Sequence, residues 1–244
     1  MQQEWFSSWF DTPYYHTLYK HRDDKEASLF LDNIIHYLKL EHQAKCWDLC
    51  CGRGRHSNYL HKKGFQVIGT DLSEQSINYA KQHHQSVGLE FYQHDMRKLF
   101  RINYFDVVFN LFTSFGYFEK TYDDEQVFNA VKKALKPKGY FVFDYLNANY
   151  VRQLFKPSDL KLIDGIEFKI NKKIEADTVI KQIDFVDNGK PYHFEERVKL
   201  FDKSYFDELA TKANLSMKHV FGDYHLTAFN PEKSPRLILI MQKI

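Results

Sequence analysis

Asp48, Gly52, Gly54 and Asp71 are the residues whose types and spacing point most directly to chemistry. The two glycines let the backbone turn tightly and lie close to a ligand. A helix that begins directly after them would aim its free N–H groups at that ligand. A carboxylate at the end of the next strand can accept both hydroxyls of a ribose. Together these residues predict a site for an adenosine-containing cofactor.

The elements around these four residues read as a strand, a loop, a helix and a second strand. Residues 46–51 form an apolar run that is typical of a buried strand, and the loop and helix start follow in residues 52–57. A second apolar run, residues 64–70, ends at Asp71. Strands continue to alternate with helices to about residue 145, which predicts a parallel sheet with helices on both faces.

The position of Asp48 indicates which cofactor the loop would hold. A dinucleotide places a pyrophosphate over the glycine loop, and a carboxylate just before the loop would repel it. S-adenosylmethionine (SAM) instead brings a positive ammonium and a sulfonium to this place, and an acid suits both. The sequence therefore favours SAM. Because Gly52-x-Gly54-x-x-Ser57 partly matches a dinucleotide fingerprint, an NAD(P)-dependent oxidoreductase is the alternative.

The glycine loop resembles the first motif of the class I SAM-dependent methyltransferases, which usually reads Asp-Leu-Gly-Cys-Gly-Thr-Gly. In this chain it reads Asp48-Leu49-Cys50-Cys51-Gly52-Arg53-Gly54 and departs from the motif at Cys50 and Arg53. Cys50 is small, so the loop should still close. The resemblance implies an α/β fold: a Rossmann-like, seven-stranded, mostly parallel sheet with helices on both faces. It also implies an antiparallel strand insertion after the fifth strand.

The same resemblance implies which residues contact the cofactor. Asp71 would bind the ribose, Asp95 would lie near the exocyclic amine of adenine, and Met96 would cover the face of the ring. Residues 110–112 end the fourth strand and would lie beside the sulfonium. They lack the two prolines of enzymes that methylate bases, which disfavours a nucleic-acid or protein-amide acceptor. The expected cofactor residues are Tyr15, Tyr19, Arg22, Asp48, Cys50, Gly52, Gly54, Asp71, Leu72, Asp95, Met96, Asn110, Leu111 and Phe112.

The N-terminal segment is dense in aromatic residues, and residues 14–23 are similar to the segment that closes over SAM in glycine/sarcosine and amino-sugar N-methyltransferases. By that resemblance Arg22 would pair with the methionine carboxylate in bidentate fashion. Tyr15 or Tyr19 would face the sulfonium through a cation–π contact. This interpretation makes residues 1–24 a lid over the cofactor. The alternative is an aromatic strap that packs on the core.

The acceptor side of the site is less clearly marked in the sequence. Methyl transfer needs alignment of the two reactants, and it needs a base only if the acceptor arrives protonated. Tyr117 and His225 are the candidate catalytic residues. The expected substrate residues are Phe115, Tyr117, Tyr145, His225 and Arg236. The sequence thus predicts transfer to nitrogen or oxygen of a small molecule. A SAM-binding protein without transfer activity is a further alternative.

Composition limits the other classes of function. The chain has 244 residues, 43% of them apolar, which is enough to form a real core. Its 34 basic and 32 acidic residues give no electrostatic sign of nucleic-acid binding. Cys46, Cys50 and Cys51 lie too close together to staple distant segments, and neither they nor the histidines show metal-ligand spacing. We therefore expect no metal, no membrane contact, a cytoplasmic location and a monomer or homodimer.

The expected organisation divides the chain at residues 24, 149 and 202. Residues 1–24 are the aromatic lid segment, 25–149 the SAM-binding core, 150–202 the antiparallel insertion that caps the substrate, and 203–244 a closing helix and strands. Pro13 should interrupt any helix in the first segment. The expected helices are residues 25–40, 55–63, 73–84, 124–135 and 204–213. The expected strands are 44–50, 65–71, 89–93, 105–111, 140–145, 165–174, 178–187, 192–201, 216–224 and 236–242.

Overall fold

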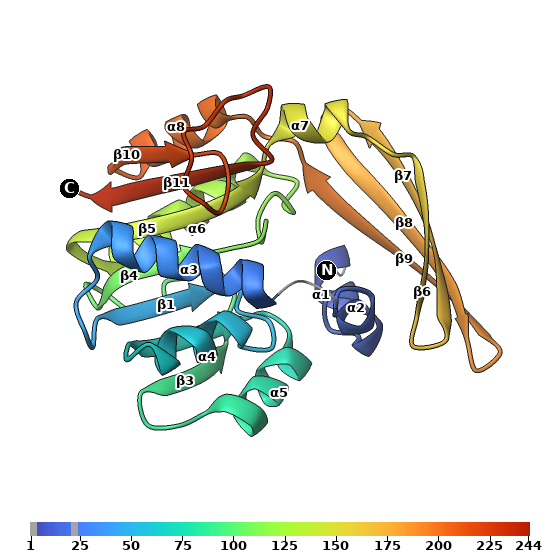
Figure 1. Ribbon diagram of the computed structural model, residues 1–244, viewed down its shortest axis with the longest axis horizontal. Helices are drawn as coiled ribbons and strands as arrows, with labels where there is room; N and C mark the ends of the chain where they lie inside the picture. The colour runs from blue at the N-terminus through green and yellow to red at the C-terminus, as the bar shows by residue number, and fades with distance from the viewer. Residues whose placement is uncertain (1–3, 21–23) are drawn as a thin grey trace.

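The computed structural model describes residues 4–20 and 24–244, and it contains a large sheet, a smaller sheet and two N-terminal helices between them (Figure 1). The large sheet has seven strands in the order β10-β11-β5-β4-β1-β2-β3. Strands β1 to β5 pair in parallel, whereas β11 is antiparallel to β5 and to β10. The predicted Rossmann-like sheet is confirmed. Its strands are β1 (Lys45–Leu49), β2 (Gln66–Asp71), β3 (Leu89–Gln93), β4 (Phe105–Asn110), β5 (Leu135–Leu146), β10 (Leu215–Phe221) and β11 (Arg236–Lys243).

Helices cover both faces of this sheet, because its central strands are apolar on both sides. Helices α3, α4 and α5 pack on one face through residues such as Phe30, Leu60 and Ile77. Helices α6 and α8 pack on the other face through residues such as Phe128 and Phe206. These helices are α3 (Asp24–Leu38), α4 (Arg55–Lys62), α5 (Glu74–His84), α6 (Thr121–Ala134) and α8 (Lys203–Lys212).

The start of β5 differs from the sequence expectation. Residues 136–139 were expected as a turn between helix and strand, but β5 already begins at Leu135. Lys138 has a positive φ of 65°, and residues 136–139 form an irregularity in the pairing with β4, because the partners on β5 pass from Leu135 directly to Tyr140. The helix expected from residue 73 begins there, with Ser73 as its N-cap: the Ser73 hydroxyl accepts a hydrogen bond from the backbone N–H of Ser76 at 3.0 Å.

The insertion forms a separate four-stranded antiparallel sheet in the order β6-β7-β8-β9. It follows the short helix α7 (Ala148–Gln153), which the sequence analysis missed. Two or three strands were expected, and the additional one is β6, whose residues are all exposed except Ile163. The predicted turn at residues 187–190 is confirmed and places Asn188 and Gly189 at positive φ. The strands are β6 (Ser158–Ile163), β7 (Ile166–Glu175), β8 (Thr178–Asp187) and β9 (Lys190–Lys199).

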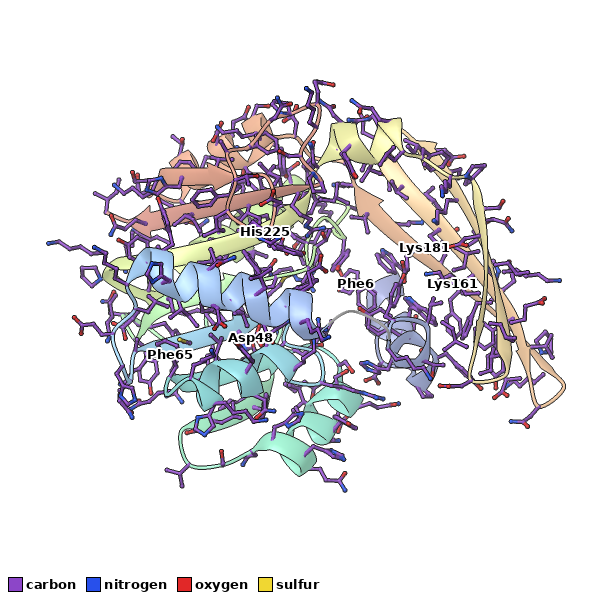
Figure 2. All side chains as sticks on the ribbon, viewed as in Figure 1. Phe6, Asp48, Phe65, Lys161, Lys181 and His225 are labelled. Atoms are coloured by element: carbon purple, nitrogen blue, oxygen red, sulfur yellow. The ribbon has the colours of Figure 1, made fainter. Side chains whose placement is uncertain are left out.

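Two short helices, α1 (Trp5–Trp9) and α2 (Pro13–Leu18), lie between the two sheets (Figures 1 and 2). Pro13 does not interrupt a helix but begins α2, where its fixed φ and missing N–H suit the first helical position. Phe6 joins the core beneath the large sheet, whereas Trp9 and Leu18 pack against the apolar face of the small sheet. The N-terminal segment therefore bridges the cores of the two sheets.

The helices within residues 4–20 and 24–244 are all too short or too polar to cross a membrane.

Candidate cofactor site

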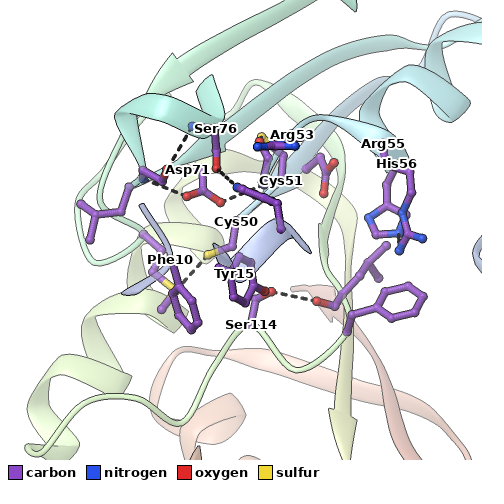
Figure 3. Close-up of a pocket in the computed structure, with 18 of the residues that line it drawn as sticks. Phe10, Tyr15, Cys50, Cys51, Arg53, Arg55, His56, Asp71, Ser76 and Ser114 are labelled. Atoms are coloured by element: carbon purple, nitrogen blue, oxygen red, sulfur yellow. Dashed lines mark hydrogen bonds between the residues drawn. The ribbon is translucent and has the colours of Figure 1, made fainter. Parts of the chain in front are cut away.

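A pocket of about 570 Å³ opens at the carboxyl ends of β1, β2, β3 and β4, on the side closed by α1 and α2 (Figure 3). Ligands of open α/β sheets bind at these strand ends, and the volume lies in the usual range for small-molecule sites. The walls come from the glycine loop, the turns after β2, β3 and β4, and the N-terminal helices.

The glycine loop after β1 is held in a tight, left-handed path. Cys50, Gly52 and Gly54 all have positive φ, at 64°, 55° and 81°. Gly54 cannot carry a side chain, because a Cβ atom there would lie 2.6 Å from the ring of Phe91. Gly54 precedes α4, so the free N–H groups at the start of that helix lie beside the loop. Cys50 takes a conformation that favours glycine, which explains why the related motif has glycine there.

Asp71 joins the end of β2 to the glycine loop. One carboxylate oxygen accepts a hydrogen bond from the backbone N–H of Gly52 at 2.8 Å, and the other accepts one from Ser73 at 2.9 Å. Burial raises the pKa of Asp71 above its ordinary value, and these backbone donors oppose that rise. Each oxygen has a further lone pair. The carboxylate therefore fixes the loop and can still accept hydrogen bonds from a ligand in the pocket.

Asp48 lies at the bottom of the pocket and is only 1% exposed. Its carboxylate accepts a hydrogen bond of 2.6 Å from the hydroxyl of Ser57, a residue of α4. Burial raises the pKa of Asp48 from 3.8 to about 6, although the Ser57 hydrogen bond lowers it. The folded chain therefore disfavours the ionised carboxylate until a positive group lies beside it.

This raised pKa predicts that part of the stability is lost as the pH rises. The folded state holds the Asp48 proton more tightly than the unfolded state, so this contribution is complete below pH 4 and disappears as the pH passes 6. A shift of about two pKa units corresponds to about 3 kcal/mol at most. We expect Asp48→Asn to remove this part of the pH dependence, measured as free energy of unfolding in urea between pH 4 and 8. Asp207→Asn, at an exposed ion pair on α8, is the control. Identical slopes for wild type and Asp48→Asn would contradict the assignment.

The turn after β3 brings Asp95 and Met96 to the pocket wall. Arg97 binds the carboxylate of Asp95 through its side chain, with a shortest distance of 2.7 Å, and also pairs with Glu4 at 2.9 Å. Burial opposes ionisation of Asp95, but the hydrogen bonds and charge of Arg97 outweigh it and lower its pKa. Arg97 thereby links this turn to the residue that precedes α1.

The turn after β4 supplies another wall. Leu111, Phe112, Ser114 and Tyr117 line the pocket. The ring of Phe112 stacks on the imidazole of His56 with centroids 4.9 Å apart and an angle of 12°. Asn110, which precedes them, is fully buried and donates its amide N–H groups to the carbonyls of Leu49 and Ser114, both at 3.3 Å. Asn110 therefore shapes this wall from behind.

The N-terminal helices are tied to both sheets. On the core side, Asp11 accepts hydrogen bonds from the Ser73 hydroxyl at 2.6 Å and from the Gln75 backbone at 3.0 Å. On the insertion side, the indole of Trp9 donates to Glu196 at 2.7 Å, and Tyr19 donates to the same carboxylate. Burial opposes ionisation of Glu196, but Lys181 and these donors lower its pKa below the ordinary value. The aromatic wall of the pocket is thus anchored by a buried, paired carboxylate.

Most of the residues expected at the cofactor site lie together in the pocket lining. These are Tyr15, Tyr19, Asp48, Cys50, Gly52, Asp71, Leu72, Asp95, Met96, Leu111, Phe112 and, from the acceptor set, Tyr117. Gly54 and Asn110 support this lining from behind. Arg22 lies outside the described residues, so the expected pairing with the methionine carboxylate remains a prediction.

Four of the expected substrate residues do not line the pocket. Phe115 and Tyr145 are fully buried in the core, and the hydroxyl of Tyr145 donates to the carbonyl of Lys199. His225 lies in the loop between β10 and β11, where its backbone N–H bonds to Asp223. Arg236 forms an ion pair with buried Asp144 at 2.7 Å. The structure thus places these four residues outside the lining of this pocket, and their contact with a substrate stays a prediction.

Several lining residues were not predicted. Arg53, Arg55 and His56 belong to the glycine loop and the start of α4, so their position next to the motif could have identified them. Arg53 stacks over the ring of Tyr79 at 4.5 Å, and its buried Nε atom has no hydrogen-bond partner among the residues that the structure describes. The others come together only through the fold: Phe6, Phe10, His16, Lys20, Cys51, Asn58, Ser73, Ser76, Tyr79, His84, His94, Ser114 and Phe118.

No three His, Cys, Asp or Glu side chains gather into a metal site within the described ranges, 4–20 and 24–244. The pocket instead has a glycine loop after β1 and carboxylates at the ends of β1 and β2 and just after β3. With the strand order of the large sheet, this arrangement defines a Rossmann-like fold with a ligand pocket at the strand ends.

Comparison with known proteins points to the methyltransferases. Residues 47–139 match the methyltransferase domain family. A Bacillus subtilis protein named as a methyltransferase, YqeM, is 29% identical over 213 residues, which cover 84% of this chain and 86% of that protein. The chain is therefore similar to methyltransferases in sequence over most of its length, and the match to the domain family covers its glycine loop and central strands. The oxidoreductase alternative is therefore not supported.

Solved structures show the same fold over nearly the whole chain. A SAM-dependent methyltransferase from Clostridium acetobutylicum has a TM-score of 0.80 at 21% identity and covers 94% of this chain and 96% of its own. The SAM-bound amino pentose methyltransferase CalS10 from Micromonospora echinaspora has a TM-score of 0.72 at 17% identity, over 96% of this chain and 98% of its own. Coverage this high means that the shared fold includes the insertion sheet as well as the large sheet.

Proposed function

We propose that this enzyme transfers the methyl group of SAM to a nitrogen or oxygen atom of a small-molecule acceptor. In this proposal Asp71 accepts hydrogen bonds from the ribose hydroxyls. Asp95, Met96 and Leu72 surround the adenine. The glycine loop and Phe112 hold the methionine part, with its ammonium near Asp48. The positive ammonium would then lie beside the buried carboxylate and favour its ionised form.

The aromatic wall of the pocket is the observation that supports a small acceptor. Phe10 lies 4.9 Å from Tyr15 and 5.3 Å from Tyr117 between ring centroids, and Phe6 lies 6.1 Å from Tyr117. These rings close a pocket of about 570 Å³ that cofactor and acceptor must share. An apolar enclosure excludes water and aligns the acceptor with the sulfonium methyl group, which is most of what methyl transfer requires.

Tyr117 is the candidate for orienting the acceptor. Its hydroxyl donates a hydrogen bond of 2.7 Å to the carbonyl of Thr113, so the phenol oxygen keeps a lone pair that can accept a hydrogen bond. We also propose that α1 and α2 act as a lid over the pocket, because His16 of α2 bonds to Ser76 of α5 at 3.1 Å and Trp9 of α1 donates to Glu196 of β9. We further propose that the enzyme is cytoplasmic, that it is a monomer or homodimer, and that it has no nucleic-acid partner.

Binding of the cofactor product should stabilise the fold. S-adenosylhomocysteine at 100 times its dissociation constant should add about 2.7 kcal/mol to the free energy of unfolding. We expect a corresponding rise in melting temperature, measured by differential scanning fluorimetry, and none with NADH at the same concentration. Stabilisation by NADH without stabilisation by S-adenosylhomocysteine would contradict the assignment of the pocket.

The acceptor is identified by a screen for turnover. Purified enzyme is incubated with SAM and a library of small amines, phenols, carboxylic acids and hydroxylated metabolites, and the release of S-adenosylhomocysteine is measured. The proposal expects acceptor-dependent release from at least one class, together with a mass increase of one methyl group on that acceptor. Release only with RNA or a protein substrate would reject the small-molecule proposal.

A further inference from the structure

A strained turn forms the pocket wall after β4. Phe112 and Thr113 both have left-handed backbone conformations, with φ of 58° and 64°. Such conformations cost free energy in residues other than glycine and persist only where the surroundings hold them. The ring of Phe112 faces the pocket, where it stacks on His56 and lies 5.3 Å below the guanidinium of Arg55. The shape of this turn therefore decides the shape of the pocket.

Asp144 holds the turn from the neighbouring strand β5. Its side chain is fully buried, and one carboxylate oxygen accepts a hydrogen bond from the backbone N–H of Phe112 at 2.8 Å. The backbone carbonyl of Asp144 accepts a second one from the N–H of Thr113 at 3.0 Å. The hydroxyl of Tyr224 donates to the same carboxylate at 3.1 Å. Both N–H groups of the strained residues thus end on Asp144.

Arg236, the first residue of β11, completes this arrangement. Its guanidinium donates to the other oxygen of Asp144, from Nε at 2.8 Å and with Nη2 at 2.7 Å. The same Nη2 donates to the hydroxyl of Thr113 at 2.9 Å. Arg236 therefore neutralises the buried carboxylate of Asp144 and also fixes the side chain of Thr113. Strands β5 and β11 come from distant parts of the chain, and the Asp144–Arg236 pair joins them near the pocket.

We propose that the Asp144–Arg236 pair is a positioning device that shapes the Phe112–Thr113 turn for the homocysteine half of the cofactor. The inference rests on the proposed placement of the cofactor, in which this turn lies beside the methionine part. Neither residue lines the pocket. The pair acts through Phe112, so it should matter for the part of the ligand that the turn contacts and little for the adenosine half.

The test compares two ligands that differ only in that half. S-adenosylhomocysteine carries the amino acid part, whereas 5′-methylthioadenosine ends after the thioether. We expect Asp144→Asn to weaken S-adenosylhomocysteine about tenfold, or about 1.4 kcal/mol, and 5′-methylthioadenosine by less than twofold, both by calorimetry. Thr113→Val removes only the hydroxyl contact with Arg236, and it should also weaken S-adenosylhomocysteine more than 5′-methylthioadenosine. Arg236→Met should also weaken S-adenosylhomocysteine more than 5′-methylthioadenosine. Arg236→Lys keeps the charge, so it should show a smaller difference between the two ligands.

A matched control comes from the other end of the same sheet. Asp106 at the start of β4 pairs with Lys136 at 2.7 Å and accepts from the backbone of Lys45 at 2.8 Å, away from the pocket. Asp106→Asn makes the same chemical change and should leave both affinities unaltered. Equal weakening of the two ligands in Asp144→Asn, or unchanged affinity for both, would overturn the positioning role. If Asp144→Asn does not fold, Thr113→Val alone decides. Wild-type protein that binds neither ligand would instead overturn the proposed function.

Discussion

Replacing Trp9 by alanine should lower the free energy of unfolding by about 3 to 5 kcal/mol. The indole is only 1% exposed and packs against Phe194 of the small sheet, with ring centroids 4.5 Å apart. Its loss leaves a cavity between the N-terminal segment and the insertion. It also removes a hydrogen-bond donor from buried Glu196, whose remaining partners include Tyr19 and Lys181. Chemical denaturation monitored by circular dichroism measures the change.

Two further variants separate the causes of this loss. Trp9→Phe keeps most of the packing but removes the donor to Glu196, so it should cost about 1 to 3 kcal/mol. Leu162→Ala removes a side chain of β6 that is 75% exposed, and it should change stability by less than about 0.5 kcal/mol. A Trp9→Ala protein as stable as wild type would mean that α1 does not pack on the small sheet in solution.

Asp71→Asn should weaken SAM binding about ten- to a hundredfold, since hydrogen bonds to a charged group contribute about 1.5 to 3 kcal/mol. Besides the expected loss of ribose contacts, the structure gives a second reason for weaker SAM binding. The carboxylate accepts the backbone N–H groups of Gly52 and Ser73, and the amide of asparagine has only one oxygen to offer them. The glycine loop should therefore become less well ordered. Isothermal titration with SAM and S-adenosylhomocysteine measures the effect.

Asp32→Asn is the control for this change. Asp32 accepts a hydrogen bond from Tyr59 at 2.8 Å and pairs with Lys63 at 2.8 Å, and it does not line the pocket. SAM affinity should stay within twofold of wild type in this variant. A folded Asp71→Asn protein with wild-type affinity would remove Asp71 from the proposed ribose site.

The first half of the fold could be predicted in detail because its signals are local. The expected strand at residues 89–93 has the observed bounds of β3, and the other parallel strands agree within a few residues except at the start of β5. Buried parallel strands read as continuous apolar runs, and helices read as apolar residues at a spacing of three or four. The glycine loop is also a local feature, since positive φ angles at Gly52 and Gly54 depend on the residues themselves.

The N-terminal helices and β6 were less predictable. Pro13 is compatible with either the end or the start of a helix, and its role depends on the chain that packs around it. Trp9 is buried because it meets Glu196 and Phe194, which are remote in the sequence. In β6 five of the six residues are exposed, so its pairing with β7 rests on backbone hydrogen bonds rather than on an apolar pattern.

The sequence by itself determined the glycine loop, the acids at the strand ends and the alternation of strands and helices that builds the parallel sheet. Each of these depends on residue type and short-range spacing. Only the tertiary structure decided that Arg236 turns to Asp144, that Tyr145 belongs to the core, and that His225 lies outside the pocket. The physical reason is that a polar or aromatic side chain near a strand end has several partners that would satisfy it. Which partner it meets depends on how distant strands are brought together.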